Sequence, residues 1–201
     1  MNRYLLIASA ALLLVACNKT GADSTSAASG APAAASTTPD AVALAGSPPD
    51  ADPAARPAPA FVAEAGVADM YEIQAGQIAL KKSKNNDVKG FAKMTVEDHT
   101  KSTTALREAI KDSGRADLAP PTQLSEEKQA MIEDLNKAPD TLFDTMYLTQ
   151  QATVHSDAER ILSAYAANGD APPLKAFAGK TAPVVQKHLD RVHQIEAKLA
   201  K

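Results

Sequence analysis

The chain has 201 residues, of which 45% are hydrophobic and 22% charged, and its 21 basic and 24 acidic side chains give a formal net charge of −3. It has no tryptophan and only four tyrosines and four phenylalanines. A nucleic-acid-binding protein needs a basic face and aromatic stacking platforms, so we expect no nucleic-acid partner. The single cysteine excludes an internal disulfide framework and a cysteine-rich zinc site.

The first sixteen residues have the organisation of an export signal. Arg3 precedes an uncharged run from Tyr4 to Val15, which is too short to cross a hydrocarbon core of about 30 Å as a helix. The next residues, Leu14-Val15-Ala16-Cys17, resemble a bacterial lipobox. That resemblance implies cleavage before Cys17 and the attachment of acyl chains such as palmitate to its thiol and new amino group. The alternative is an ordinary secretory signal with an incidental cysteine.

The residue after the cysteine bears on location. Asn18 stands where an aspartate would be a retention signal for the inner membrane, so we predict an outer-membrane lipoprotein that faces the periplasm and contacts the membrane through the lipid on Cys17.

Residues 17–59 are then predicted to be a disordered linker. From Asn18 to Pro59, 33 of 42 residues are Ala, Ser, Thr, Gly or Pro, and such a segment cannot bury a core.

The rest of the chain, residues 60–201, has helical periodicity throughout and no strand-like alternation. Long apolar repeats predict helices over about 60–83, 87–113, 139–168 and 172–199, and a short helix capped by Ser125 extends to about Asn136. Gly114 is a suitable residue to end the second helix. Two helical pairs joined by a long connection that contains a short helix predict an all-α domain, a ferritin-like four-helix bundle.

The side chains that are expected to face the centre of this bundle become polar halfway along the helices. Each long helix contributes one residue that could bind a metal, namely Glu72, His99, His155 or His188, and the distances of these residues from the interhelical turns place them at similar heights. One carboxylate and three imidazoles at one depth predict a site for a transition metal such as Zn, Cu or Fe. Asp98 is a candidate to orient one of these ligands.

Two alternatives to a metal site stay open on the residues alone. The histidines can belong to a metal-free buried polar network, or some of them can face solvent. A carboxylate-bridged di-iron centre is disfavoured, because such centres use Glu-x-x-His and the residues three before the histidines are Val96, Ala152 and Val185.

The chain also resembles a known family. The segments on which the resemblance rests are Phe61-Val62, Met70-Tyr71-Glu72, Val88-Lys89-Gly90-Phe91-Ala92, Asp98-His99-Thr100-Lys101, Phe143-Asp144 with Tyr147, His155, Phe177-Ala178, and Pro183 to Leu189. They are similar to the domain-of-unknown-function family 4142 (DUF4142) of bacterial envelope proteins, over about residues 60–199. The resemblance implies a ferritin-like bundle and no established activity. Its recurring acidic and histidine positions match Glu72, Asp98, His99, His155 and His188.

These observations favour a lipid-anchored bundle with a non-catalytic binding or structural role in the cell envelope, whose partner is an envelope protein or a metal ion. The same bundle as a metal-binding protein is the alternative. A metal-dependent oxidoreductase has only the fold analogy behind it. The chain has no nucleophile elbow and no glycine-rich phosphate loop, so hydrolase and kinase chemistry have no support.

Overall fold

The computed structural model describes residues 56–201. This part of the chain contains four long helices, α1 (Ala58–Lys82), α2 (Asn86–Asp112), α4 (Asp140–Asn168) and α5 (Pro172–Leu199), and one short helix, α3 (Glu126–Lys137). The predicted signal peptide, the lipidated Cys17 and the linker as far as residue 55 lie outside the described residues. No helix in the range 56–201 is long and apolar enough to cross a membrane.

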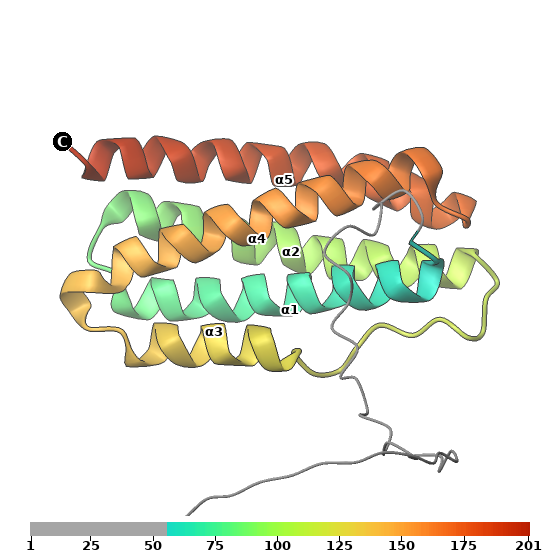
Figure 1. Cartoon of the computed structure of the whole chain (residues 1–201), viewed down its shortest axis with the longest axis horizontal. Coiled ribbons are helices and arrows are strands. Elements are labelled where there is room, and N and C mark those ends of the chain that lie inside the picture. The colour runs from blue at the N-terminus through green and yellow to red at the C-terminus, as the bar shows by residue number, and fades with distance from the viewer. Residues whose placement is uncertain (1–55) are drawn as a thin grey trace, which may run out of the picture. The chain divides into compact units, whose positions relative to one another are not determined.

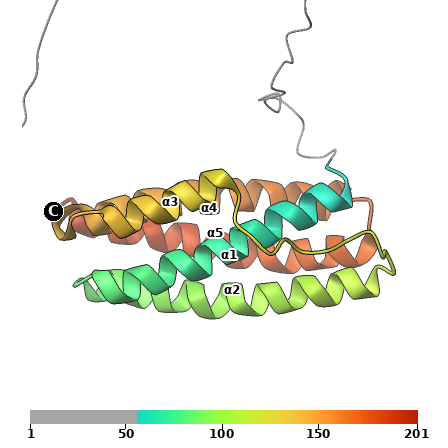
Figure 2. The same cartoon turned by 90° about the horizontal axis from the view of Figure 1, so that it is seen from below.

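The long helices pack as two antiparallel hairpins (Figures 1 and 2). Helix α1 lies against α2, α4 lies against α5, and α2 and α5 join the two hairpins. The connection from α2 to α4 runs the length of the bundle, and within it α3 packs mainly on α1 (Figure 1). The prediction of an all-α bundle with a helix in a long crossover is therefore confirmed.

The helix boundaries follow local signals in the sequence. The side chain of Asn85 accepts hydrogen bonds from the backbone N–H groups of Asp87 and Val88, and Ser125 accepts one from Lys128. Gly114 ends the second helix at φ 66°, a conformation that glycine adopts without steric penalty.

The start of the first helix differs from the expectation. Helix α1 begins at Ala58, so Ala58 and Pro59, which were assigned to the linker, are helical. A proline is tolerated in the first turn because its missing N–H has no intrahelical partner there. Ala58 is fully buried in the core, and this burial extends the helix beyond the apolar pattern from which it was predicted.

The buried core consists of two apolar clusters separated by a polar layer. One cluster surrounds Phe61, where the ring of Tyr165 stacks on it with centroids 3.8 Å apart. The other surrounds Tyr147 and Phe91 towards the opposite ends of the same helices. The buried polar side chains between them are Asp69, Glu72, Thr95, His99, Gln151, His155 and His188. This layer is the only buried group of histidines in the described part of the chain.

Candidate metal centre

Three histidines from three helices meet in the polar layer. His99 on α2, His155 on α4 and His188 on α5 are each no more than 5% exposed, and one ring nitrogen of each lies within 4.8 Å of the other two. The closest pair is Nε2 of His155 and Nδ1 of His188, at 3.3 Å. The predicted meeting of these three side chains at one depth is therefore observed, since α5 runs antiparallel to both α2 and α4 and the helices are in the expected register (Figure 1).

The second nitrogen of each histidine faces an oxygen acceptor. Nδ1 of His99 lies 2.8 Å from Oδ1 of Asp69, and Nδ1 of His155 lies 2.9 Å from the carbonyl oxygen of Gln151. Nε2 of His188 lies 3.2 Å from Oδ2 of Asp98. Because these acceptors carry no proton of their own, the N–H of each neutral imidazole belongs on the nitrogen that faces its acceptor.

When all three imidazoles are neutral, this arrangement leaves three lone pairs directed at one another. Nε2 of His99 is buried and has no hydrogen-bond partner, and the two close nitrogens of His155 and His188 both lack a hydrogen when their other nitrogens donate. Facing lone pairs repel unless a cation lies between them. Metal-binding histidines in proteins have this pattern, in which the outer N–H is held by a carboxylate or carbonyl and the inner nitrogen binds the ion.

Glu72 lies outside the cluster that it was predicted to complete. Its nearest contact to a histidine joins Oε1 to Nδ1 of His155, at 3.8 Å, which is the nitrogen already turned towards Gln151. The carboxyl group is 1% exposed and neither of its oxygens has a hydrogen-bond partner. Burial raises the pKa of Glu72 to about 7. The structure thus brings together three of the four predicted ligands and sets Glu72 behind one of them.

Other buried polar atoms near Glu72 also lack a hydrogen-bond partner. The amide of Gln151 and the hydroxyl of Tyr147 are also buried without a hydrogen-bond partner. Native cores satisfy nearly all such groups, and clusters of exceptions are typical of functional sites that hold an ion or water.

The three histidines differ in the direction in which their pKa values are shifted. Burial and the neighbouring charge of His99 lower the pKa of His188 to about 4, and the same causes hold the pKa of His155 well below its ordinary value. Burial also opposes protonation of His99, but the hydrogen bond with Asp69 and the charge of Glu72 outweigh it and raise the pKa of His99. Two of the inner nitrogens are therefore free to bind a cation at neutral pH.

Asp98 contacts a histidine, as the sequence had suggested, while Asp69 was missed. Asp98 approaches His188 from α2 and is itself held by Lys101 at 2.8 Å. Asp69 is 4% exposed and accepts from His99 and, at 3.3 Å, from the hydroxyl of Thr103. The spacing of three residues between Asp69 and Glu72 puts both on one face of α1, and this spacing was the feature of the sequence that could have identified Asp69.

The chain was also compared with known proteins. A family model described as a domain of unknown function (DUF4142) matches residues 43–195. No curated protein and no solved structure matches the chain.

Proposed function

The chain belongs to the DUF4142 family, whose description names no activity, and from its site we propose that it is a metal-binding protein that holds one divalent transition ion between His99, His155 and His188. The observation that carries this proposal is the convergence of three histidine nitrogens whose opposite nitrogens all face oxygen acceptors. A metal-free network of three neutral imidazoles does not account for that convergence, because such a network would place a donor opposite each acceptor.

The spacing of the nitrogens suits Zn²⁺ or Cu²⁺. Two nitrogens bound to one tetrahedral zinc at about 2.0–2.1 Å lie about 3.3 Å apart. The inner nitrogens of His155 and His188 already have this separation. Since no pair in the cluster exceeds 4.8 Å, His99 needs to approach by at most about 1.5 Å, which a small side-chain rotation supplies.

The ligand type favours the same ions. Imidazole is a good ligand for zinc and copper, whereas non-haem iron commonly takes two histidines with a carboxylate. Among residues 56–201, the buried carboxylates near the cluster are Asp69 and Glu72, and each lies on the far side of an imidazole from the inner nitrogens. A site with three histidines leaves one coordination position for water or another small ligand.

Three carboxylates surround the site and suit a doubly charged ion. Each carboxylate faces the outer nitrogen of one histidine. The oxygen–nitrogen distance is 2.8 Å from Asp69 to His99, 3.2 Å from Asp98 to His188 and 3.8 Å from Glu72 to His155. Burying a dication without nearby negative charge is strongly unfavourable. Their total charge of up to −3 offsets that of the metal.

We also propose that the lipobox anchors this domain to the outer membrane through Cys17, on the periplasmic side. The support is the sequence Leu14-Val15-Ala16-Cys17 after the apolar run. Radiolabelled palmitate incorporated by the wild-type chain, and not by Cys17→Ala, would test the anchor.

Elemental analysis of the untagged full chain tests the metal proposal. We expect close to one zinc or copper ion per chain after purification without chelator, and the loss of that ion in His99→Ala and His188→Ala. His193→Ala is the matched control, because His193 is exposed on α5 and lies outside the cluster. A wild-type chain that holds no metal and takes up neither Zn²⁺ nor Cu²⁺ would contradict the proposal.

A further inference from the structure

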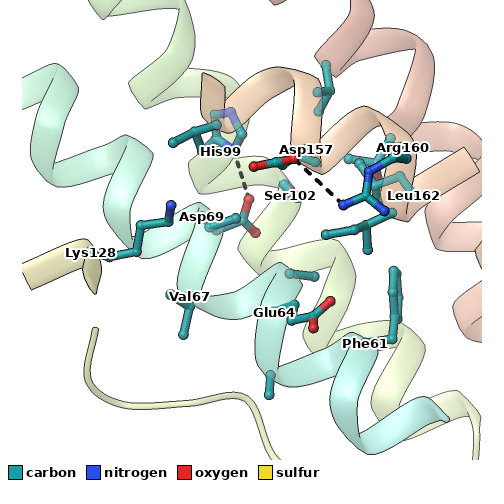
Figure 3. A pocket seen from close by; sticks show the side chains of 18 of the residues that line it. Phe61, Glu64, Val67, Asp69, His99, Ser102, Lys128, Asp157, Arg160 and Leu162 are labelled. Atoms are coloured by element: carbon teal, nitrogen blue, oxygen red, sulfur yellow. Dashed lines mark hydrogen bonds and ion pairs between the residues drawn. The ribbon is translucent and has the colours of Figure 1, made fainter. Parts of the chain in front are cut away.

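A pocket of about 390 Å³ opens between α1 and α4 and ends on Asp69 and His99 (Figure 3). It reaches the outer side of the metal centre, where Asp69 holds His99, and it contacts neither His155 nor His188. A molecule bound in this pocket would therefore meet the carboxylate behind one metal ligand without occupying the metal position.

The pocket walls are mainly apolar. Its apolar lining includes Phe61, Val67, Val154, Ile161, Leu162 and Phe177. A dry apolar cavity of about 150 Å³ holds one benzene ring. A pocket of 390 Å³ therefore has room for a molecule of about two rings, and an apolar lining with few polar groups is typical of sites for small organic ligands.

The charged side chains at the pocket mouth are already paired with opposite charges. The pairs are Glu64 with Arg56, Lys128 with Glu127, and Arg160 with Asp157. The last of these pairs is visible beside the pocket in Figure 3. Because no unpaired charge from the described range 56–201 faces the mouth, the pocket favours an uncharged ligand.

The floor of the pocket offers hydrogen-bond acceptors. Oδ1 of Asp69 accepts from His99 and Oδ2 from Thr103, so each oxygen keeps one acceptor position. Ser102 also lines the pocket. A ligand that carries a hydroxyl can donate to Asp69 there, and a hydrogen bond to a charged acceptor is among the stronger ones.

We propose that this pocket binds an uncharged, mostly apolar molecule of about two rings whose hydroxyl donates a hydrogen bond to Asp69. Phenols and cyclic alcohols of this size are the chemical class. The inference rests on the apolar lining and on the free acceptor positions of Asp69, so it stands or falls separately from the metal proposal.

The test is a pair of matched probes on the full chain, unlipidated and stripped of metal. 2-Naphthol has the required size and hydroxyl, and 2-methoxynaphthalene has the same rings but no donor. We expect 2-naphthol to bind at least about tenfold more tightly, because losing a hydrogen bond to a charged group weakens binding by that factor or more. Fluorescence titration measures both affinities.

A variant that fills the pocket locates the binding. Ala158 is half-buried on α4 and lines the pocket, so Ala158→Phe should weaken 2-naphthol binding at least tenfold. Ser156→Phe is the control on the same helix, since Ser156 is exposed and outside the pocket, and it should bind as the wild type does. Amide chemical shifts of the wild-type protein give a second measurement that needs no variant, with changes expected at Ala65 and Phe177.

Any of four results would overturn the proposal. The first three are the absence of binding by 2-naphthol, equal affinity for the two probes, and shift changes that avoid the pocket residues. The fourth is unchanged binding in a folded Ala158→Phe protein.

Discussion

Asp69 and His99 form a buried contact between α1 and α2 in which Oδ1 of the aspartate lies 2.8 Å from Nδ1 of the histidine. Both side chains are about 6% exposed. The contact fixes which nitrogen of His99 carries the hydrogen and turns Nε2 towards His155 and His188. Asp69 also lines the pocket between α1 and α4, so one carboxylate borders both proposed sites.

Asp69→Asn should weaken metal binding while the fold is kept. Outer carboxylates orient a metal-binding histidine and raise its basicity, and their loss commonly lowers metal affinity by about 10–100-fold. We expect a decrease of this size in Zn²⁺ affinity, measured by competition with a chelator of known affinity.

Asp157→Asn is the control for that change. Asp157 lines the same pocket, is exposed and pairs only with Arg160, at 3.7 Å, so its loss should leave Zn²⁺ affinity within about twofold. Equal effects of the two substitutions would mean that Asp69 acts through general charge and not through His99.

The helices could be predicted from the sequence because their ends carry explicit signals. Asn85 and Ser125 cap helices, and Gly114 adopts the positive φ that its position requires. The depth of His99, His155 and His188 followed from the rise per residue and the short interhelical turns. These features depend on local geometry and on regular spacing.

Asp69 and the displacement of Glu72 could not be predicted in the same way. An aspartate on a helix is usually solvated, so Asp69 becomes a core residue only when His99 and Thr103 of another helix are beside it. Whether Glu72 reaches the centre of the cluster or the back of His155 depends on a small rotation of α1 about its own axis. Apolar periodicity does not define rotation that finely.

Glu72→Gln should stabilise the metal-free protein at alkaline pH. Burial raises the pKa of Glu72 to about 7, so the contribution of this group to stability is complete below its ordinary pKa of about 4.5 and is lost as the pH rises through 7. Glutamine has a similar shape and no charge to bury. We expect a gain of roughly 3 kcal/mol in the free energy of unfolding at pH 8, and little change at pH 4, by urea denaturation.

The metal-bound protein should respond with the opposite sign. With a dication beside His155, the negative charge of Glu72 becomes favourable, and Glu72→Gln should lower Zn²⁺ affinity severalfold at pH 8. A glutamine variant with unchanged Zn²⁺ affinity would show that Glu72 does not balance the metal charge.

Two glycine substitutions should affect stability in opposite directions. A Cβ atom on Gly76 of α1 would lie 2.6 Å from Cγ2 of Val96 and 3.1 Å from the carbonyl oxygen of Ala92, whereas one on Gly90 would meet nothing within 4 Å. Gly76→Ala should therefore destabilise the bundle by about 1–3 kcal/mol. Gly90→Ala removes backbone freedom from the unfolded chain and should stabilise it by about 0.5–1 kcal/mol. Thermal unfolding of both variants compares them, and a stabilised Gly76→Ala protein would contradict the close approach of α1 and α2.

Asp87 should contribute to the loss of stability in acid. It lies in the first turn of α2 and accepts from Lys198 at 3.0 Å and from Arg191 at 2.6 Å, both on α5. These two hydrogen bonds lower the pKa of Asp87 in the folded protein. Its contribution is therefore complete above the ordinary carboxyl pKa of about 3.9 and is lost as the pH falls through the lower folded value. Asp87→Asn should be less stable than the wild type at pH 7, and the difference should narrow as the pH falls below the folded pKa of Asp87, where both carry a neutral side chain. A constant difference in unfolding free energy as the pH falls would mean that Asp87 does not stabilise the fold through its charge.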